Sequence, residues 1–345
     1  MSNAPQTGLF PTSMMDANPT KESSKVSIIT RTKNRPILLA RALSSVLSQS
    51  HGDWELIVVN DGGDEYETSR VLGQYMQAFS NRLKVIHHIE SKGMEAASNA
   101  ALKIATGSYV VVHDDDDSWK PEFLKTTVEF LNLPSNSRFA AVATNCEVIQ
   151  EKLSEFSVVT TGKFPWGHWN DRVDIIRLAR TNSFPPISLL IRMSVVELIG
   201  GFNESLPVLG DWEYNLRVFS IGDIGTIAEP LAYYHHRVNQ EGSYGNTVIA
   251  GASMHHDYNV LLRNSLVRLA IRKDPSSLGI LNTLLTVIDN LESTIVQQIR
   301  EDTHRSLAIV IEHQKSVDKA LRPLRWAWRW LLPIRRIIAR ARGRI

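Results

Sequence analysis

The sequence predicts an α/β fold in which a mostly parallel sheet is flanked by helices and followed by a C-terminal helical extension. Two patterns support this fold class. Between residues 26 and 113, short apolar strands alternate with amphipathic helical segments, and polar loops follow the strands. Over residues 250–316, leucine and isoleucine recur at helical spacing instead. The alternation in the first region favours parallel strands with helices on both faces of the sheet.

The first predicted strand, residues 26–30, reads as a buried strand and ends in a turn-prone segment at 32–36. The pattern then predicts, in order, a helix at 37–50, a strand at 54–59, a helix at 65–80, a strand at 83–88, a helix at 94–106 and a strand at 108–113. Ligands of such sheets bind beyond the carboxyl ends of the strands. We therefore expect the chemistry of the protein to lie in the loops that follow these strands.

Strand signals become sparser after residue 120, and this half is expected to build the second wall of the cleft. The predicted strands are 138–148, 186–193 and 225–229, and the predicted helices are 121–132, 171–180, 194–199 and 211–221. The segment 273–277, Lys-Asp-Pro-Ser-Ser, predicts a break between two helices of the extension.

Charge is distributed unevenly along the chain. The formal net charge is +2, but residues 319–345 hold nine Lys or Arg and no acidic residue, which leaves −7 on the remainder. No charge-free apolar stretch reaches the length of about eighteen residues that a membrane-spanning helix needs. Residues 1–24 lack the basic and apolar segments of a secretory signal and are expected to be flexible.

Cysteine usage indicates a reducing compartment. Cys146 is the only cysteine, which excludes an internal disulfide and a cysteine-based zinc site. We expect its thiol to be buried and structural. A cytoplasmic protein fits this usage.

The strongest local signal is a run of four carboxylates, residues 114–117, directly after the apolar strand at 109–113. Adjacent anions repel one another unless a cation is supplied. Mg²⁺ or Mn²⁺ held by one or two carboxylates and by substrate phosphates would meet that need. The alternative is a solvated acidic turn that caps the next helix.

At this point the sequence resembles the family-2 glycosyltransferases. Residues 26–36 match the family's opening motif V-S-I-I-x-x-T-x-N-R-P, and residues 114–119 resemble its D-x-D-D-x-W motif. The other landmarks occur in the family's order: Trp54 to Gly62, Gly93 to Asn99 with Ala105 to Gly107, Gly200 to Glu204, Gly210 to Trp212, and Glu229 to Leu231 with Tyr233 and Tyr234. The resemblance spans roughly residues 25–245 and implies a GT-A-type fold.

The resemblance also implies roles for individual residues in binding a nucleotide-sugar donor. Thr32 and Asp61 would contact the base, and Asp114 would lie at the ribose and the metal. Asp116 would be the main protein ligand of Mn²⁺ or Mg²⁺ between the two phosphates. Two further residues complete the expected nucleotide-sugar site: Arg35 and Asp115.

On the acceptor side, Asp211 resembles the family's catalytic base, and direct displacement would invert the anomeric centre. The alternative is that Asp211 only caps the helix that begins at Trp212. Of the basic residues 235–237, one histidine could complete the metal shell or donate to a phosphate. His236 is favoured, although neighbours on a strand face opposite ways and the sequence does not say which one faces in.

Several positions depart from the family pattern. Arg31 replaces a common proline, Lys33 a stacking aromatic residue, and Ser98 an arginine. Gly210 replaces a common acidic residue immediately before Asp211. Arg31 and Lys33 could add phosphate or base contacts, and the loss of the aromatic ring weakens any assignment of the base as uracil.

The C-terminal tail combines basic residues with tryptophans at 326, 328 and 330. In residues 334–345, isoleucines gather on one helical face and arginines on another, which is typical of a helix lying in a membrane interface. Pro323 and Pro333 are expected to break the tail into segments. Two other interpretations compete: the tail packs on the acidic body or on another subunit, or it binds nucleic acid. Nucleic acid is the least favoured, because binding of phosphates does not require three closely spaced tryptophans.

Four regions follow: a flexible segment 1–24, a GT-A glycosyltransferase domain 25–249, a helical extension 250–317 and a membrane-associating helix 318–345. We expect an inverting, metal-dependent glycosyltransferase at the inner face of the cell membrane, acting on a lipid-linked or glycan acceptor in bacterial surface polysaccharide synthesis. The alternatives are a non-catalytic scaffold that binds nucleotide-sugar or glycan, and a nucleotidyltransferase, disfavoured because no Gly-rich triphosphate loop follows the first strand. A homo-oligomer through the extension remains open.

Overall fold

The computed structural model describes residues 23–153, 157–237 and 252–342, and it describes side chains only up to residue 323. The chain divides into two compact units, Met1–Arg263 and Asn264–Ile345. The first unit contains the sheet and the candidate site.

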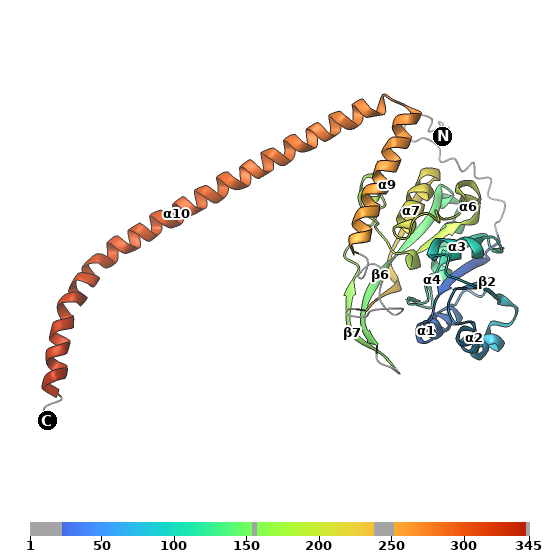
Figure 1. Cartoon of the computed structure of the whole chain (residues 1–345), viewed down its shortest axis with the longest axis horizontal. Helices are drawn as coiled ribbons and strands as arrows, with labels where there is room; N and C mark the ends of the chain where they lie inside the picture. Colours follow the sequence, from blue (N-terminus) through green and yellow to red (C-terminus); the bar gives the residue numbers. More distant parts are fainter. Residues whose placement is uncertain (1–22, 154–156, 238–251, 343–345) are drawn as a thin grey trace, which may run out of the picture. The chain divides into compact units, whose positions relative to one another are not determined.

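The first half of the sheet is parallel, as expected. Strands β1, β2, β3 and β4 stand in the order β3-β2-β1-β4, and every neighbouring pair in this part is parallel. The elements are β1 (Val26–Thr32), α1 (Pro36–Leu47), β2 (Trp54–Asp61), α2 (Glu65–Phe79), β3 (Leu83–His88), α3 (Met94–Leu102) and β4 (Tyr109–Val112). The carboxyl ends of β1, β2 and β4 therefore meet at one edge of the sheet. Figure 1 draws this N-terminal part of the first unit in blue to cyan.

The second half of the sheet is mixed. It continues from β4 as β8-β6-β9-β5, with β7 on the outer side of β6, and only the pair β6 and β9 is parallel. Its elements are β5 (Ser118–Trp119), α4 (Phe123–Asn132), β6 (Phe139–Leu153), β7 (Val158–Pro165), α5 (Ile175–Arg180), β8 (Leu189–Arg192), α6 (Met193–Ile199), α7 (Gly210–Ile221) and β9 (Asp223–Arg237). The α/β fold class is confirmed, and its parallel part is the N-terminal half.

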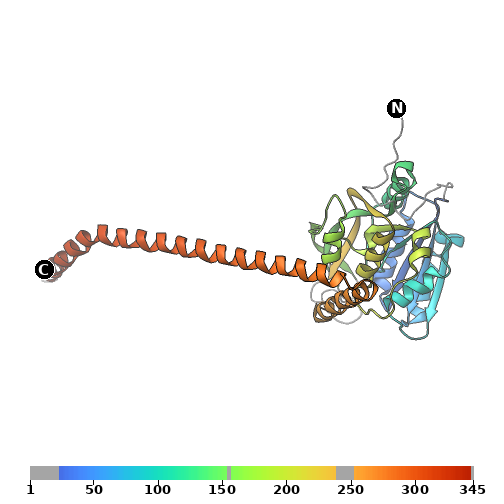
Figure 2. The same ribbon diagram turned by 90° about the horizontal axis from the view of Figure 1, so that it is seen from above.

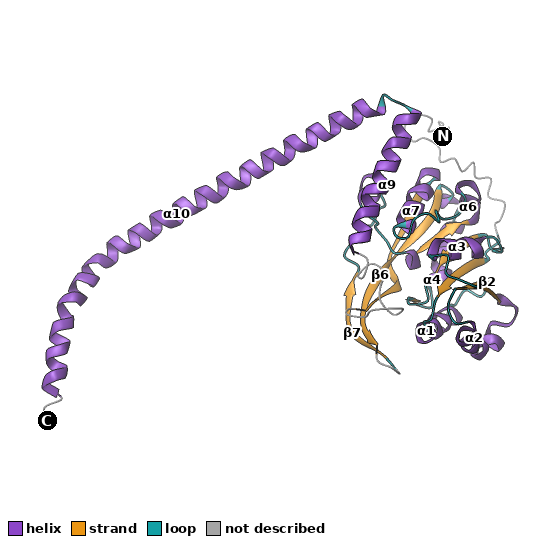
Figure 3. Ribbon diagram, in the orientation of Figure 1, coloured by secondary structure: helices purple, strands orange, loops and turns teal. Residues whose placement is uncertain are grey.

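Helices cover both faces of the sheet, because the strands alternate their apolar side chains between two cores (Figure 3). Ile28 of β1 and Leu56 of β2 lie in one core, which helices α1, α2 and α4 complete. Ile29 and Ile57 lie in the other, with residues of α3, α6 and α7. Cys146 is buried in the first core, as expected of a structural thiol.

The helical extension begins with α9 (Ala252–Lys273), and Leu262 of this helix is buried in the second core. The break expected at 273–277 is confirmed, because the next helix, α10 (Ser277–Arg342), begins there. The prediction that prolines break the tail was wrong, since α10 continues as a single helix through Pro323 and Pro333. Figure 2 draws this helix as one unbroken ribbon. A proline inside a helix removes one hydrogen bond, a loss that a helix of this length sustains. Among the described helices, none is long and apolar enough to cross a membrane.

Candidate active site

A pocket of about 640 Å³ lies beyond the carboxyl ends of β1, β2 and β4. Its wall includes seven of the eight site residues that the sequence suggested: Thr32, Arg35, Asp61, Asp114, Asp115, Asp116 and Asp211. These residues come from positions as far apart as 32 and 211. They are brought together by the fold, because they are not neighbours in the sequence. The eighth residue, His236, does not line this pocket.

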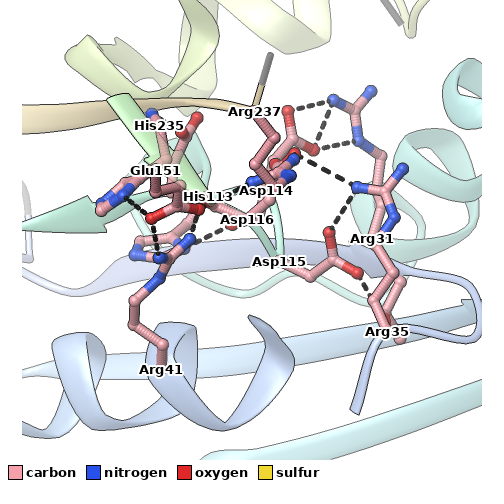
Figure 4. Close-up of polar contacts among 12 residues, drawn as sticks. Arg31, Arg35, Arg41, His113, Asp114, Asp115, Asp116, Glu151, His235 and Arg237 are labelled. Carbon is pink, nitrogen blue, oxygen red and sulfur yellow. Dashed lines mark hydrogen bonds and ion pairs between the residues drawn. The ribbon is translucent and has the colours of Figure 1, made fainter. Parts of the chain in front are cut away.

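Asp114 is held by Arg31, the last residue but one of β1. Arg31 donates from Nε and Nη2 to the Asp114 carboxylate at 2.6–2.8 Å, the paired geometry in which a guanidinium holds a carboxylate firmly. Its remaining nitrogen, Nη1, lies 3.4 Å from Glu95 Oε2 and 3.4 Å from Ser98 Oγ. Arg31 thus bridges the acidic run and helix α3 (Figure 4 shows its contact with Asp114).

Asp115 is buried beneath the pocket and joins two of the predicted donor-binding residues. Thr32 donates from Oγ1 to Asp115 Oδ2 at 2.7 Å, and Arg35 Nη1 lies 3.1 Å from Asp115 Oδ1. Burial raises the pKa of Asp115, and the nearby Arg35 only partly offsets this effect. The three residues form one hydrogen-bonded group.

Asp116 faces the pocket with one carboxylate oxygen engaged and the other available. Oδ2 accepts from Arg35 at 3.2 Å and from Arg237, whereas no described residue donates to Oδ1. Burial opposes charge on this group, but Arg237 and Arg35 outweigh it and lower the pKa of Asp116. The carboxylate is therefore ionised and has a free oxygen.

Behind the acidic run, Glu151 of β6 collects three basic side chains. Arg41 of α1 donates to Glu151 Oε2 at 2.7 Å, Arg237 donates to Oε1 at 3.1 Å, and His235 Nδ1 lies 2.9 Å from Oε2 (Figure 4). Burial disfavours charge on Glu151, but the hydrogen bonds from His235 and Arg41 lower its pKa to about 2. Arg41 and Arg237 also contact Asp116, so Glu151 fixes the guanidinium groups that neutralise the run.

Arginines pair with Asp114, Asp115 and Asp116, whereas Asp117 accepts from the backbone amide of His235. The repulsion within the acidic run, which suggested a metal, is therefore relieved in part by arginines. Among the described residues, no three His, Cys, Asp or Glu side chains lie close enough to form a protein-only metal site. A metal that takes most of its ligands from substrate phosphates needs only one or two carboxylates. The free Oδ1 of Asp116 fits this requirement, because hard divalent cations prefer oxygen ligands.

Asp61 lines the pocket, yet both of its oxygens are used to hold the segment after β3. Oδ1 accepts from His88 Nδ1 and the Lys92 amide, and Oδ2 accepts from Ser91 Oγ and the Gly93 amide, all within 2.7–3.0 Å. Burial raises the pKa of Asp61, but these hydrogen-bond donors outweigh burial and lower the pKa overall. Contact of Asp61 with a base stays a prediction.

Asp211 lies in the first turn of α7 and points to the other side of the pocket. Asn182 donates from Nδ2 to Asp211 Oδ2 at 2.7 Å, and Asn215 in turn donates to Asn182 Oδ1 at 3.1 Å. The helix cap is Leu209, so Asp211 does not occupy the capping position that was the alternative interpretation. Burial raises the pKa of Asp211, which makes the carboxylate a stronger base.

On β9, residues 235 and 237 face Glu151, and 236 faces the opposite way, as alternation along a strand requires. His236 packs its ring 4.6 Å from Tyr234, which lines the pocket. The basic residue that reaches Asp116 from this strand is Arg237. A metal-ligating role for His236 remains a prediction.

Other residues of the site gave no recognisable signal in the sequence. Glu95 and Glu151 were not identified from the sequence, because their arginine partners, Arg31 and Arg41, are far from them in the chain. His255 and Tyr258 of α9 also line the pocket, from a region that showed only helical periodicity. The His255 Nε2 atom is buried without a partner among the described residues.

The fold and the pocket define the class of α/β domains that bind a ligand beyond the strand ends of a parallel sheet. Residues 27–182 match the model of glycosyl transferase family 2. The expected resemblance to this family is thereby confirmed.

Individual relatives agree with this family. The glycosyltransferase EpsE of Bacillus subtilis (strain 168) is 35% identical over 127 residues, which are 37% of this chain and 45% of EpsE. The colanic acid biosynthesis glycosyl transferase WcaA of Escherichia coli (strain K12) is 38% identical over 105 residues, 30% of this chain and 37% of WcaA. This chain thus matches less than half the length of either relative.

Among solved structures, S. aureus TarS 1-349 in complex with UDP-GlcNAc is similar, with a TM-score of 0.49 and 20% sequence identity. The match covers 64% of this chain and 61% of that chain.

Proposed function

We propose that this protein is an inverting glycosyltransferase that transfers a sugar from a nucleotide-sugar donor to an acceptor hydroxyl. One observation carries the proposal. Asp211, held by Asn182, lines the same pocket as residues 114–116 of the acidic run, so the proposed base and the proposed diphosphate-binding residues share one cavity. The family-2 domain supports glycosyl transfer as the reaction class.

In the proposed reaction, the acceptor oxygen attacks the anomeric carbon from the face opposite the diphosphate. The bond between that carbon and the diphosphate oxygen breaks, and the diphosphate leaves with the electron pair. Asp211 takes the proton of the attacking hydroxyl, for which its raised pKa suits it. A single displacement of this kind inverts the anomeric centre.

Negative charge develops on the departing diphosphate, and the pocket holds several groups that would meet it. Arg31 and Arg35 line the pocket while each is bound to an aspartate. Asp116 would hold Mn²⁺ or Mg²⁺ through its free Oδ1 together with the donor phosphates. When bound, such a cation supplies positive charge where the leaving group forms.

We further propose that the acceptor is a glycan or a lipid-linked sugar in bacterial surface polysaccharide synthesis, and that the protein works at the cytoplasmic face of the membrane. The name of the relative WcaA, a colanic acid biosynthesis glycosyl transferase, supports the pathway class. The basic, tryptophan-containing tail supports the membrane site, although its side chains from residue 324 onward lie outside the described residues.

The proposed function is tested by differential scanning fluorimetry of the full chain with UDP, GDP and dTDP, each with and without Mn²⁺. Wild type should be stabilised by one nucleotide, more strongly with Mn²⁺, and Asp116→Ala should lose the metal-dependent part. Asp289→Ala, a change on the exposed surface of α10, serves as the matched control and should behave as wild type.

Enzymatic activity is then separated from simple binding by following slow hydrolysis of the corresponding nucleotide sugar. Release of free sugar that depends on Asp211 supports the transferase. Nucleotide binding without any hydrolysis or transfer would favour the alternative of a non-catalytic scaffold at the membrane. Absence of a shift with every nucleotide would contradict donor binding altogether.

A further inference from the structure

Glu95 places a second carboxyl group beside Asp211. The residue lies in the first turn of α3, is 5% exposed, and lines the pocket. Its Oε2 atom is 3.4 Å from Arg31 Nη1, a distance at the limit of a hydrogen bond. No described residue donates to Oε1, so one oxygen of this buried carboxyl has no partner in the part of the chain that the structure describes.

The position of this oxygen is defined by Gly210. A Cβ atom at residue 210 would lie 2.0 Å from Glu95 Oε1 and 2.4 Å from Cδ, so the carboxyl rests directly on the Gly210 backbone. Residue 210 immediately precedes Asp211 at the start of α7. The Glu95 carboxyl has therefore crossed the pocket to the side of the proposed base, and only glycine leaves room for it there.

Arg31 connects this carboxyl to the donor side. The same guanidinium that holds Asp114 with two nitrogens presents its third nitrogen to Glu95. Asp114 makes the shorter contacts with Arg31, and Glu95 makes only one contact with it, through Oε2. Arg31 therefore helps to position Glu95 but leaves its second carboxylate oxygen without a donor among the described residues. Glu95 keeps Oε1 for a ligand on the Asp211 side.

We propose that Glu95 binds the acceptor by accepting a hydrogen bond from a hydroxyl adjacent to the one that attacks the donor. This inference rests on the proposed function and adds a substrate class to it. The acceptor must present two neighbouring hydroxyl groups, as a sugar ring does, so that one reaches Asp211 and the other reaches Glu95 Oε1. A simple alcohol would satisfy only Asp211.

The test is transfer to octyl glycosides of glucose, galactose, mannose and N-acetylglucosamine, using the nucleotide sugar whose nucleotide stabilises the protein. At a pH above the pKa of the Glu95 carboxyl, where this group is charged, Glu95→Gln and Glu95→Ala should raise the acceptor KM roughly 10- to 100-fold, the loss expected for a hydrogen bond to a charged group. The donor KM should change much less. Glu129→Gln, an exposed change on α4, is the matched control.

A deoxy acceptor separates binding from a merely structural role. Removal of the neighbouring hydroxyl from the best glycoside should raise the acceptor KM of wild type by about the same factor as the Glu95 substitutions do. The same removal should leave the acceptor KM of Glu95→Ala almost unchanged. If Glu95 only balances the charge of Arg31, the deoxy acceptor would cost both proteins equally, and that result overturns the proposal.

Gly210 provides a rescue. Gly210→Ala alone should displace Glu95 and reproduce the acceptor defect, whereas it should add little in the Glu95→Ala background. Gly210→Asp combined with Glu95→Ala returns a carboxyl to the vacated space and should recover part of the acceptor affinity. Unchanged acceptor KM in the Glu95 variants of an active enzyme contradicts the inference alone, whereas a wild type without nucleotide stabilisation or transfer contradicts the proposed function.

Discussion

At the scale of single residues, some carboxylates of the site are paired with arginines, whereas another has only a neutral partner. Arg31 and Arg237 pair with Asp114 and Asp116, and these contacts hold the acidic run together. Asp211 differs because its partner, Asn182, is neutral. A buried carboxylate with a neutral donor keeps its basicity, which a paired arginine would remove.

Asp211→Asn is expected to reduce the transfer rate about 10²–10⁴-fold, the usual contribution of a general base. Nucleotide binding should persist, because no contact of the acidic run depends on Asp211. The measurement is kcat alongside the thermal shift with nucleotide. Loss of nucleotide binding together with activity would instead indicate that Asp211 serves the donor site.

The pH dependence follows from the raised pKa of Asp211. The base acts when deprotonated, so kcat/KM should fall as pH decreases through this pKa, above the ordinary aspartate value of about 3.9. Asn182→Ala removes a donor that stabilises the charged form, so the pKa should rise and the acid limb should move to higher pH. A pH profile of kcat/KM checks this, with Asn290→Ala on α10 as the control. An unmoved limb would assign it to another group, and Glu95, whose pKa burial raises to about 7, is the nearest candidate.

At the scale of elements, the site depends on how tightly loops approach one another at the strand ends. Gly62, which follows β2, has φ +71, and a Cβ atom there would lie 2.2 Å from the Ser91 amide nitrogen. This close approach brings the 88–93 segment against Asp61, which then accepts its amides. The loop that lines the pocket is thus positioned by a backbone contact.

Gly62→Ala should lower the free energy of unfolding by about 1–3 kcal/mol, because a side chain at positive φ is strained and the Ser91 backbone would have to move. Gly52→Ala is the matched control, since nothing lies within 4 Å of its Cβ position. Urea unfolding measures both. Equal midpoints for the two variants would show that the loops accommodate the methyl group.

The elements themselves were largely predictable from sequence. Buried strands such as β1 and β2 are rich in Val, Ile and other apolar residues, and their predicted bounds differ from the structure by about two residues at one end. Strand β7 was missed because its residues, apolar ones included, are mostly exposed, so no alternation of apolar and polar residues marks it. Its pairing with β6 is a tertiary contact that local patterning does not encode.

The site was predictable only where its residues form a motif. The acidic run and Asp211 stand next to recognisable neighbours, whereas Arg41 and Glu151 meet across 110 positions. The sequence showed that Arg31 and Gly210 depart from the family pattern, but it did not show which residues they contact. The structure shows that Arg31 lies 3.4 Å from Ser98 and that Gly210 leaves room for the Glu95 carboxyl.

At the scale of the whole molecule, the two units differ in what they bury. The first unit holds the sheet and the whole pocket lining, including the α9 residues His255 and Tyr258. In the second, α10 leaves isoleucines such as Ile280 and Ile309 more than half exposed. An exposed apolar helix with a basic end suits a surface that offers both apolar and anionic groups.

Replacement of the five arginines at 335, 336, 340, 342 and 344 by glutamine should weaken binding to anionic vesicles by several kcal/mol, at about 1 kcal/mol per basic residue near the surface. Nucleotide stabilisation should be unaffected, because the pocket lies in the first unit. Co-sedimentation with phosphatidylglycerol vesicles at low and high salt measures the change. Binding that is equal in both proteins would contradict a membrane role for the tail.

The contact between Glu95 and Gly210 also has an evolutionary consequence. Residue 210 is not free to vary while residue 95 is glutamate, because any side chain at 210 would take the space of the Glu95 carboxyl. Homologous sequences should therefore show correlated change: a larger residue at the position of Gly210 should accompany a shorter one at the position of Glu95. A lineage could move this acid from one helix to the other only by passing through a glycine or alanine at both positions.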